Sequence, residues 1–122
     1  MLGLRALVVE GEYLVAAEIE QTLKEAGAGE ITLSRSFAEA SGLLSMSGFD
    51  LAIIEAGFGS PEAIGFSTSL QKAGVPVIVT SADRAVQSLF TGAIPLEKPF
   101  DSTSLLVACR IARPGGAASN PA

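Results

Sequence analysis

Residues 4–12 of the chain read LRALVVEGE, a short and almost continuously apolar run that ends in two acids. Such a run is typical of a parallel β-strand that is covered by helices on both faces. The acids come directly where this strand is expected to end. Because open parallel sheets bind their ligands beyond the carboxyl ends of the strands, this stretch predicts both a fold class and the position of a site.

The rest of the chain alternates between extended and helical patterns. Further strands are expected at residues 31–34, 50–54, 75–80 and 94–97, and helices at about 12–26, 36–47, 61–74, 82–91 and 102–112. Five β-strand and α-helix pairs in this order imply right-handed crossovers and a parallel sheet. The sequence therefore predicts a three-layer, doubly wound α/β fold.

Helix start signals support these boundaries. Ser36 and Glu39 have the spacing of a capping box, in which a hydroxyl and a carboxylate satisfy free amides at the start of a helix. Ser60 followed by Pro61 is typical of an N-cap with proline at the first helical position. Asp101 is expected to cap the last helix.

The amino-acid composition excludes several classes of function. With 122 residues, 48% of them hydrophobic, the chain has the size of one domain with one core. Its net charge of −5, with only eight Lys and Arg, argues against a nucleic-acid partner or an anionic membrane. The absence of His excludes Ser-His-Asp and Cys-His nucleophiles and His-ligated metals on this chain. Most hydrolase chemistry is thereby excluded.

Domain limits and location are expected as follows. One domain should cover residues 1–112, and residues 113–122, where Pro and Gly are frequent, should form a flexible tail. No run approaches the length of a membrane span, and the first apolar run lacks the features of a signal peptide. The lone Cys109 is expected to be a buried, inert thiol. A cytoplasmic location follows as the expectation.

Polar residues end four of the expected strands. Glu10 and Glu12 follow the first strand, Glu55 the third, Ser81 the fourth and Lys98-Pro99 the fifth. Because the carboxyl ends of parallel strands meet at one edge of the sheet, these side chains should converge there.

This set of residues resembles the response-regulator receiver domain over residues 4–112. The resemblance implies a flavodoxin-like sheet of order 2-1-3-4-5 and a cis peptide at Lys98-Pro99. In that family the acids at the position of residues 8–12 hold a magnesium ion, and the residue at Glu55 is an aspartate that accepts a phosphoryl group from a histidine kinase. Ser81 matches the hydroxyl that senses the phosphoryl group, and Lys98 matches the lysine that contacts it.

Three residues depart from the family's pattern. Glu55 is one methylene longer than the family's Asp, and a displacement of about 1 Å can cost on the order of 10²-fold in a positioned reaction. Gly11 replaces the second acid, although magnesium is typically held by only one or two carboxylates. Pro95 replaces the aromatic residue that reports the switched state. We therefore expect no bound metal or cofactor, no enzymatic activity and a role that is independent of phosphorylation.

Several site residues have two interpretations. Glu55 is either a built-in partial mimic of the phosphorylated state or a structural ion-pair partner of Lys98, and the two are compatible. Glu10 and Glu12 are either remnants of a cation site or acids that favour the positive end of the helix dipole; the sequence favours the site for Glu10 and the helix for Glu12. Ser81 is either a switch residue or the N-cap of the following helix.

The resemblance implies a single-domain bacterial signalling protein that binds a histidine kinase, a phosphotransfer protein or an output regulator. The expected binding face is formed by the fourth helix, the fifth strand and the fifth helix. The sequence favours no oligomeric state. Two alternatives are a conventional phosphorylated receiver and a cofactor-binding flavodoxin-like protein. The acidic turn after the first strand counts against the second, since an anion-binding turn would be rich in Gly, Ser and Thr.

Overall fold

The structure is a computed structural model that describes residues 2–44 and 48–113. Its centre is a five-stranded, all-parallel sheet of order β2-β1-β3-β4-β5, which confirms the predicted fold class and strand order. The strands are β1 (Arg5–Val9), β2 (Glu30–Ser34), β3 (Leu51–Glu55), β4 (Val77–Ser81) and β5 (Ile94–Glu97). The helices are α1 (Tyr13–Glu25), α2 (Phe37–Leu44), α3 (Pro61–Lys72), α4 (Arg84–Gln87) and α5 (Ser102–Ala112).

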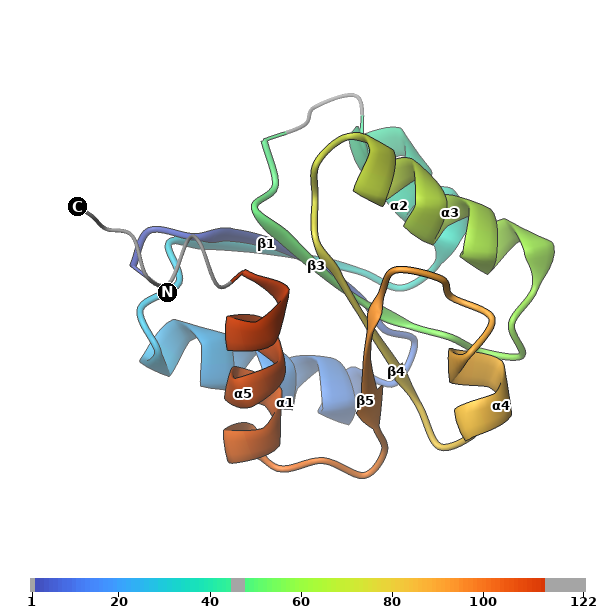
Figure 1. Cartoon of the computed structure of the whole chain (residues 1–122). Coiled ribbons are helices and arrows are strands. Elements are labelled where there is room, and N and C mark those ends of the chain that lie inside the picture. The colour runs from blue at the N-terminus through green and yellow to red at the C-terminus, as the bar shows by residue number, and fades with distance from the viewer. Residues whose placement is uncertain (1, 45–47, 114–122) are drawn as a thin grey trace.

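Helices cover both faces of this sheet, as Figure 1 shows. Val8 and Ile53 pack with residues of α1 and α5 on one face. Leu7 and Ile54, which alternate with them along the same strands, pack with residues of α2 and α3 on the other. Full burial of such an aliphatic side chain contributes about 1.5–3 kcal/mol. The two-sided burial explains why β1 is apolar over residues 6–9 and β3 over residues 51–54.

The predicted helix starts are largely observed. The Ser60 hydroxyl accepts a hydrogen bond from the Ala63 amide, and the Asp101 carboxylate accepts one from the Ser104 amide. The Ser36 hydroxyl accepts the Glu39 amide as a capping box requires. The Glu39 carboxylate, however, accepts the amide of Arg35 and not that of Ser36. The reciprocal bond is thus displaced by one residue.

The fourth helix differs from its prediction. We expected it over residues 82–91, but α4 contains only the four residues Arg84–Gln87. Beyond it the amides of Leu89 and Phe90 bond to the carbonyls of Val86 and Gln87, which are tighter turns than an α-helix makes. Burial of Phe90 and the positive φ of 85° at Gly92 turn the chain toward β5. The sequence pattern of residues 82–91 does not reveal this burial or this turn, because both depend on tertiary packing.

Other expectations have mixed outcomes. The expected burial of Cys109 is confirmed, and it raises the pKa of the thiol to about 11. In the described part of the chain no helix has the length and apolar character needed to cross a bilayer. The predicted end of the second helix at residue 47, and residues 114–122 of the tail predicted at 113–122, lie outside the described residues.

Candidate functional site

Three carboxylates surround one ammonium group at the carboxyl end of the sheet. Lys98 Nζ lies 3.2 Å from Glu10 Oε1, 3.2 Å from Glu55 Oε2 and 3.9 Å from Glu12 Oε1. We call these four residues the acid–lysine cluster. The ion pair between Glu55 and Lys98, one of the two interpretations of Glu55, is present, and the lysine contacts Glu10 as well.

Strand register explains this convergence. Val9 pairs with Ile54, so the next residues along the two strands, Glu10 and Glu55, end neighbouring strands at the same level. Ser81 pairs with Glu97, and the Lys98 amide donates a hydrogen bond of 2.9 Å to the Ser81 carbonyl. The expected cis peptide between Lys98 and Pro99 is observed. The ends of β1, β3, β4 and β5 therefore supply the cluster and its backbone support.

Burial governs the electrostatics of Glu10. Its side chain is only 1% exposed, and this burial raises the pKa of the carboxyl above its ordinary value. The amide of Glu12, which donates to Glu10 Oε2, opposes the rise, the charge of Glu55 adds to it, and Lys98 again opposes it. Without the ammonium group, two adjacent carboxylates would repel each other in a poorly solvated place.

Burial acts on the pKa of Lys98 in the opposite direction. Burial of its side chain, which is 17% exposed, acts to lower the pKa of the ammonium group. The charges of Glu10 and Glu55 and their hydrogen bonds outweigh this effect, so the pKa of Lys98 is raised above its ordinary value. The lysine is therefore positively charged at neutral pH.

Replacing Glu10 by Gln tests the raised pKa of that carboxyl. A raised pKa means that the folded protein binds this proton more tightly than the unfolded chain does. Ionisation of Glu10 therefore lowers the free energy of unfolding as the pH rises from the ordinary value of 4.5 through the folded pKa. We expect the Gln variant to lose less stability than wild type over this rise. Urea unfolding at several pH values measures the difference, and a difference that stays constant with pH would contradict the prediction.

The observed positions of Ser81 and Glu12 bear on the two interpretations that the sequence allowed for each residue. The N-cap of α4 is Asp83, whose carboxylate accepts the amides of Ala85 and Val86, so the N-cap interpretation of Ser81 is wrong. The Ser81 hydroxyl instead accepts the Asp83 amide and closes the turn after β4. Glu12 occupies the N-cap position of α1 without a side-chain cap bond, and its side chain is 64% exposed.

Two supporting contacts were missed by sequence reasoning. Glu10 Oε2 accepts the Glu12 amide and so fixes the turn between β1 and α1. The buried amide of Gln87 donates to the carbonyl of Ser81 at 3.3 Å and to that of Val79 at 3.5 Å. Because the Lys98 amide bonds to the same Ser81 carbonyl, Gln87 links α4 to the acid–lysine cluster. A glutamine in a short polar helix gives no sequence signal of burial.

The acid–lysine cluster does not fit magnesium. The position expected to hold a second acid is Gly11, and the Lys98 ammonium lies within ion-pair distance of both strand-end carboxylates. Magnesium needs near-octahedral oxygen coordination, so it would have to displace this ammonium group. Within the described residues, no group of three or more His, Cys, Asp or Glu has a metal-binding arrangement.

We accordingly expect no saturable magnesium binding at millimolar concentrations. Isothermal titration calorimetry of the wild-type protein measures it, with Glu55→Gln as the matched variant. Saturable heat in wild type that disappears in Glu55→Gln would show that the carboxylates release Lys98 and coordinate the ion.

Comparisons with known proteins agree with the fold. No protein-family model matches the chain, and no curated protein matches its sequence. Solved structures do match. A response regulator from Thermotoga maritima has a TM-score of 0.78 at 20% identity, over 91% of this chain and 98% of that one. A response regulator receiver protein from Sinorhizobium medicae has a TM-score of 0.75 at 25% identity, over 90% and 94%. An orphan response regulator of H. pylori has a TM-score of 0.72 at 21% identity, over 93% and 98%.

These likenesses extend over nearly the whole of each chain. The sheet order, the flanking helices and the similar structures together define the fold as that of response-regulator receiver domains.

Proposed function

We propose that this chain is a receiver domain of two-component signalling that acts by binding another protein, independently of phosphorylation. Its fold and the names of the similar structures support a place in such signalling. The observation that carries the proposal is the contact of 3.2 Å between Lys98 Nζ and Glu55 Oε2.

The resemblance assigns Lys98 the contact with a phosphoryl group. In this chain a carboxylate oxygen of Glu55 already makes that contact, so the lysine is neutralised without phosphate. Glu55 carries less negative charge than a phosphorylated aspartate, and it is therefore a partial mimic. Both interpretations of Glu55, as a phosphoryl mimic and as a structural ion-pair partner, predict this contact with Lys98. They differ in whether Glu55 also alters a distant binding surface.

The proposed binding surface is the face formed by α4, β5 and α5. A cavity of about 640 Å³ at its α4 and β5 part is lined by residues that include Gln87, Phe90 and Pro95. The hydrogen bond from Gln87 to the Ser81 carbonyl supplies a physical route from the acid–lysine cluster to this face. The partner we propose is a histidine kinase, a phosphotransfer protein or an output regulator in a bacterial cytoplasm.

A conventional phosphorylated receiver is the alternative. The Glu55 side chain is 35% exposed, so a small phosphodonor can reach it. Incubation of the wild-type protein with acetyl phosphate and magnesium separates the two functions. We expect its intact mass to remain unchanged, and the gain of one phosphoryl group that hydroxylamine removes would establish the alternative.

A further inference from the structure

Thr80 of β4 carries a buried hydroxyl group that has no hydrogen-bond partner in the described part of the chain. The residue is only 1% exposed. Buried polar groups in proteins are nearly always hydrogen-bonded, because leaving such a bond unmade costs free energy. The hydroxyl of the next residue, Ser81, differs in that it accepts the Asp83 amide at 3.0 Å. The unpaired hydroxyl of Thr80 therefore indicates a second arrangement of the site in which this group is bonded.

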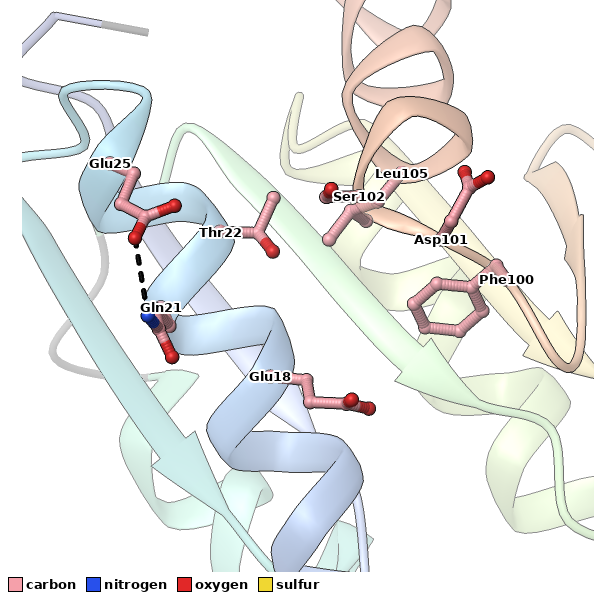
Figure 2. A pocket seen from close by; sticks show the side chains of 8 residues that line it. All are labelled: Glu18, Gln21, Thr22, Glu25, Phe100, Asp101, Ser102 and Leu105. Atoms are coloured by element: carbon pink, nitrogen blue, oxygen red, sulfur yellow. Dashed lines mark hydrogen bonds between the residues drawn. The ribbon is translucent and has the colours of Figure 1, made fainter.

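Thr80 lies on the face of the sheet that α1 and α5 cover. Ile78, two residues earlier in β4, belongs to the core on that face together with Leu105 of α5, which Figure 2 shows. Side chains alternate between the two faces along a strand, so Thr80 lies on the same face as Ile78. Glu55 shares this face for the same reason, because Ile53, two residues before it in β3, belongs to the same core.

Strand register makes Glu55 the neighbour of Thr80 that can accept its hydroxyl proton. The two residues are paired across β3 and β4. On the other side Thr80 pairs with Leu96 of β5, whose side chain has no acceptor. Neighbouring strands lie about 4.8 Å apart, so the Glu55 carboxylate and the Thr80 hydroxyl are within reach of each other. In the observed arrangement Glu55 Oε2 instead lies 3.2 Å from Lys98 Nζ.

The order of the strands determines where Glu55 moves when it loses Lys98. Because β3 lies between β1 and β4, Glu55 has Glu10 on one side and Thr80 on the other. Lys98 Nζ lies 3.2 Å from each of the two carboxylates and compensates their repulsion. Without this ammonium group the carboxylates repel each other. Movement of Glu55 away from Glu10 leads toward Thr80, whose hydroxyl can donate a strong bond to a charged acceptor.

We propose that the Thr80 hydroxyl is the alternative hydrogen-bond donor for Glu55, which bonds to Thr80 when Lys98 is withdrawn. An anionic group of a protein partner that binds the Lys98 ammonium causes this exchange. The exchange alters the end of β4, because the Thr80 carbonyl accepts the Ala56 amide at 2.9 Å and the Ser81 carbonyl accepts the Lys98 amide. Thr80 is thus a positioning residue for Glu55. The inference rests on the proposed function and deepens it by naming how the same site is regulated.

A double-mutant cycle of Thr80→Val and Lys98→Met tests the exchange, because valine has the shape of threonine without its hydroxyl. In the wild-type background Thr80→Val should raise the urea midpoint of unfolding, since it removes an unpaired buried hydroxyl. In the Lys98→Met background it should lower the midpoint, since it removes the bond to Glu55. Midpoint shifts of the same sign in both backgrounds would overturn the proposal. A lower midpoint in both would show that the hydroxyl is already bonded, for example to an internal water, and a higher one that it stays unpaired.

Thr80→Ser is the matched control, because it keeps the hydroxyl and loses one methyl group. It should lower the midpoint by a similar amount in both backgrounds. The amide signal of Ala56 supplies a second measurement: Lys98→Met should shift it more when residue 80 carries a hydroxyl than in the Thr80→Val background. Equal shifts would contradict the exchange. If Lys98→Met alone unfolds the chain, the same concentration of trimethylamine N-oxide added to all the proteins restores the folded state for the comparison.

The phosphorylation assay remains a separate test. A wild-type protein that accepts phosphate would refute the proposed function, whatever the result of the double-mutant cycle. Midpoint shifts of the same sign would refute only the exchange between Lys98 and Thr80 and leave independence from phosphorylation unaffected.

Discussion

We expect the variant that carries both Gly11→Asp and Glu55→Asp to gain detectable acyl phosphate from acetyl phosphate and magnesium, and wild type and each single variant to react poorly. This is the expected result if two separate defects disable the site. The first is a missing magnesium ligand at Gly11, and the second is an acceptor that is one methylene too long at Glu55. Phosphoryl transfer depends on positioning and on charge neutralisation together, so neither single change should suffice.

The structure allows both substitutions. A Cβ added at Gly11 meets only the Arg35 carbonyl oxygen, at 3.7 Å, which is ordinary van der Waals contact. Glu55→Asp shortens the side chain and withdraws its carboxylate from Lys98, which frees the lysine for a phosphoryl group. The double variant therefore changes the chemistry of the site, and the Cβ that it adds at residue 11 meets no clash.

Intact-mass measurement before and after hydroxylamine follows the reaction, because hydroxylamine cleaves acyl phosphates. Lys98→Met in the double-variant background is the matched control and should abolish the gain. A folded double variant that stays unreacted would show that a further departure, such as Pro95 or the turn at Ser81, disables the site. Ready phosphorylation of wild type would refute independence from phosphorylation.

Lys98→Met should lower the free energy of unfolding by about 2–4 kcal/mol at neutral pH, since breaking a buried ion pair leaves an uncompensated charge. The expected loss of stability is this large because the carboxylate of Glu10 is almost fully buried beside Glu55. Partial exposure of Glu55 keeps the loss toward the lower end of that range. The loss should shrink at acidic pH, where Glu10 takes up a proton more readily than an ordinary glutamate.

Two further variants isolate the cause. Glu10→Gln added to Lys98→Met should recover most of the lost stability, because it removes the uncompensated charge. Lys24→Met breaks the exposed pair with Glu20 and should cost only about 0.3–0.5 kcal/mol. Urea unfolding measures all of them. Equal losses from Lys98→Met and Lys24→Met would show that the acid–lysine cluster contributes no more than a surface pair.

The sheet and most helices were predictable because their signals are local. The apolar run of β1, the N-cap at Ser60 and the β5 boundaries at residues 94–97 each depend on a few neighbouring residues. The shortness of α4 was not predictable in this way. It depends on burying Phe90 and on the bond from Gln87 to the Ser81 carbonyl, which exist only after β4 and α4 have packed together.

The acid–lysine cluster was predictable for a different reason. Parallel strands that end at the same edge bring Glu10, Glu55 and Lys98 together whatever the detailed side-chain packing. The finer arrangement was not accessible from sequence. Ser81 closes a turn while Asp83 caps the helix, and both are short polar residues that suit either role.

The measurement that tests the central claim most directly compares amide chemical shifts in wild type, Glu55→Gln and Glu12→Gln. If Glu55 acts as a partial phosphoryl mimic, removing its charge should shift the amide signals of α4. The route is the Ser81 carbonyl, which accepts hydrogen bonds from the backbone amide of Lys98 and the side-chain amide of Gln87. Glu12→Gln removes the same charge at the longer distance of 3.9 Å and should leave α4 nearly unchanged. Glu55→Gln shifts that stay within the immediate neighbours of Lys98 would contradict the account and leave Glu55 as a structural ion-pair partner.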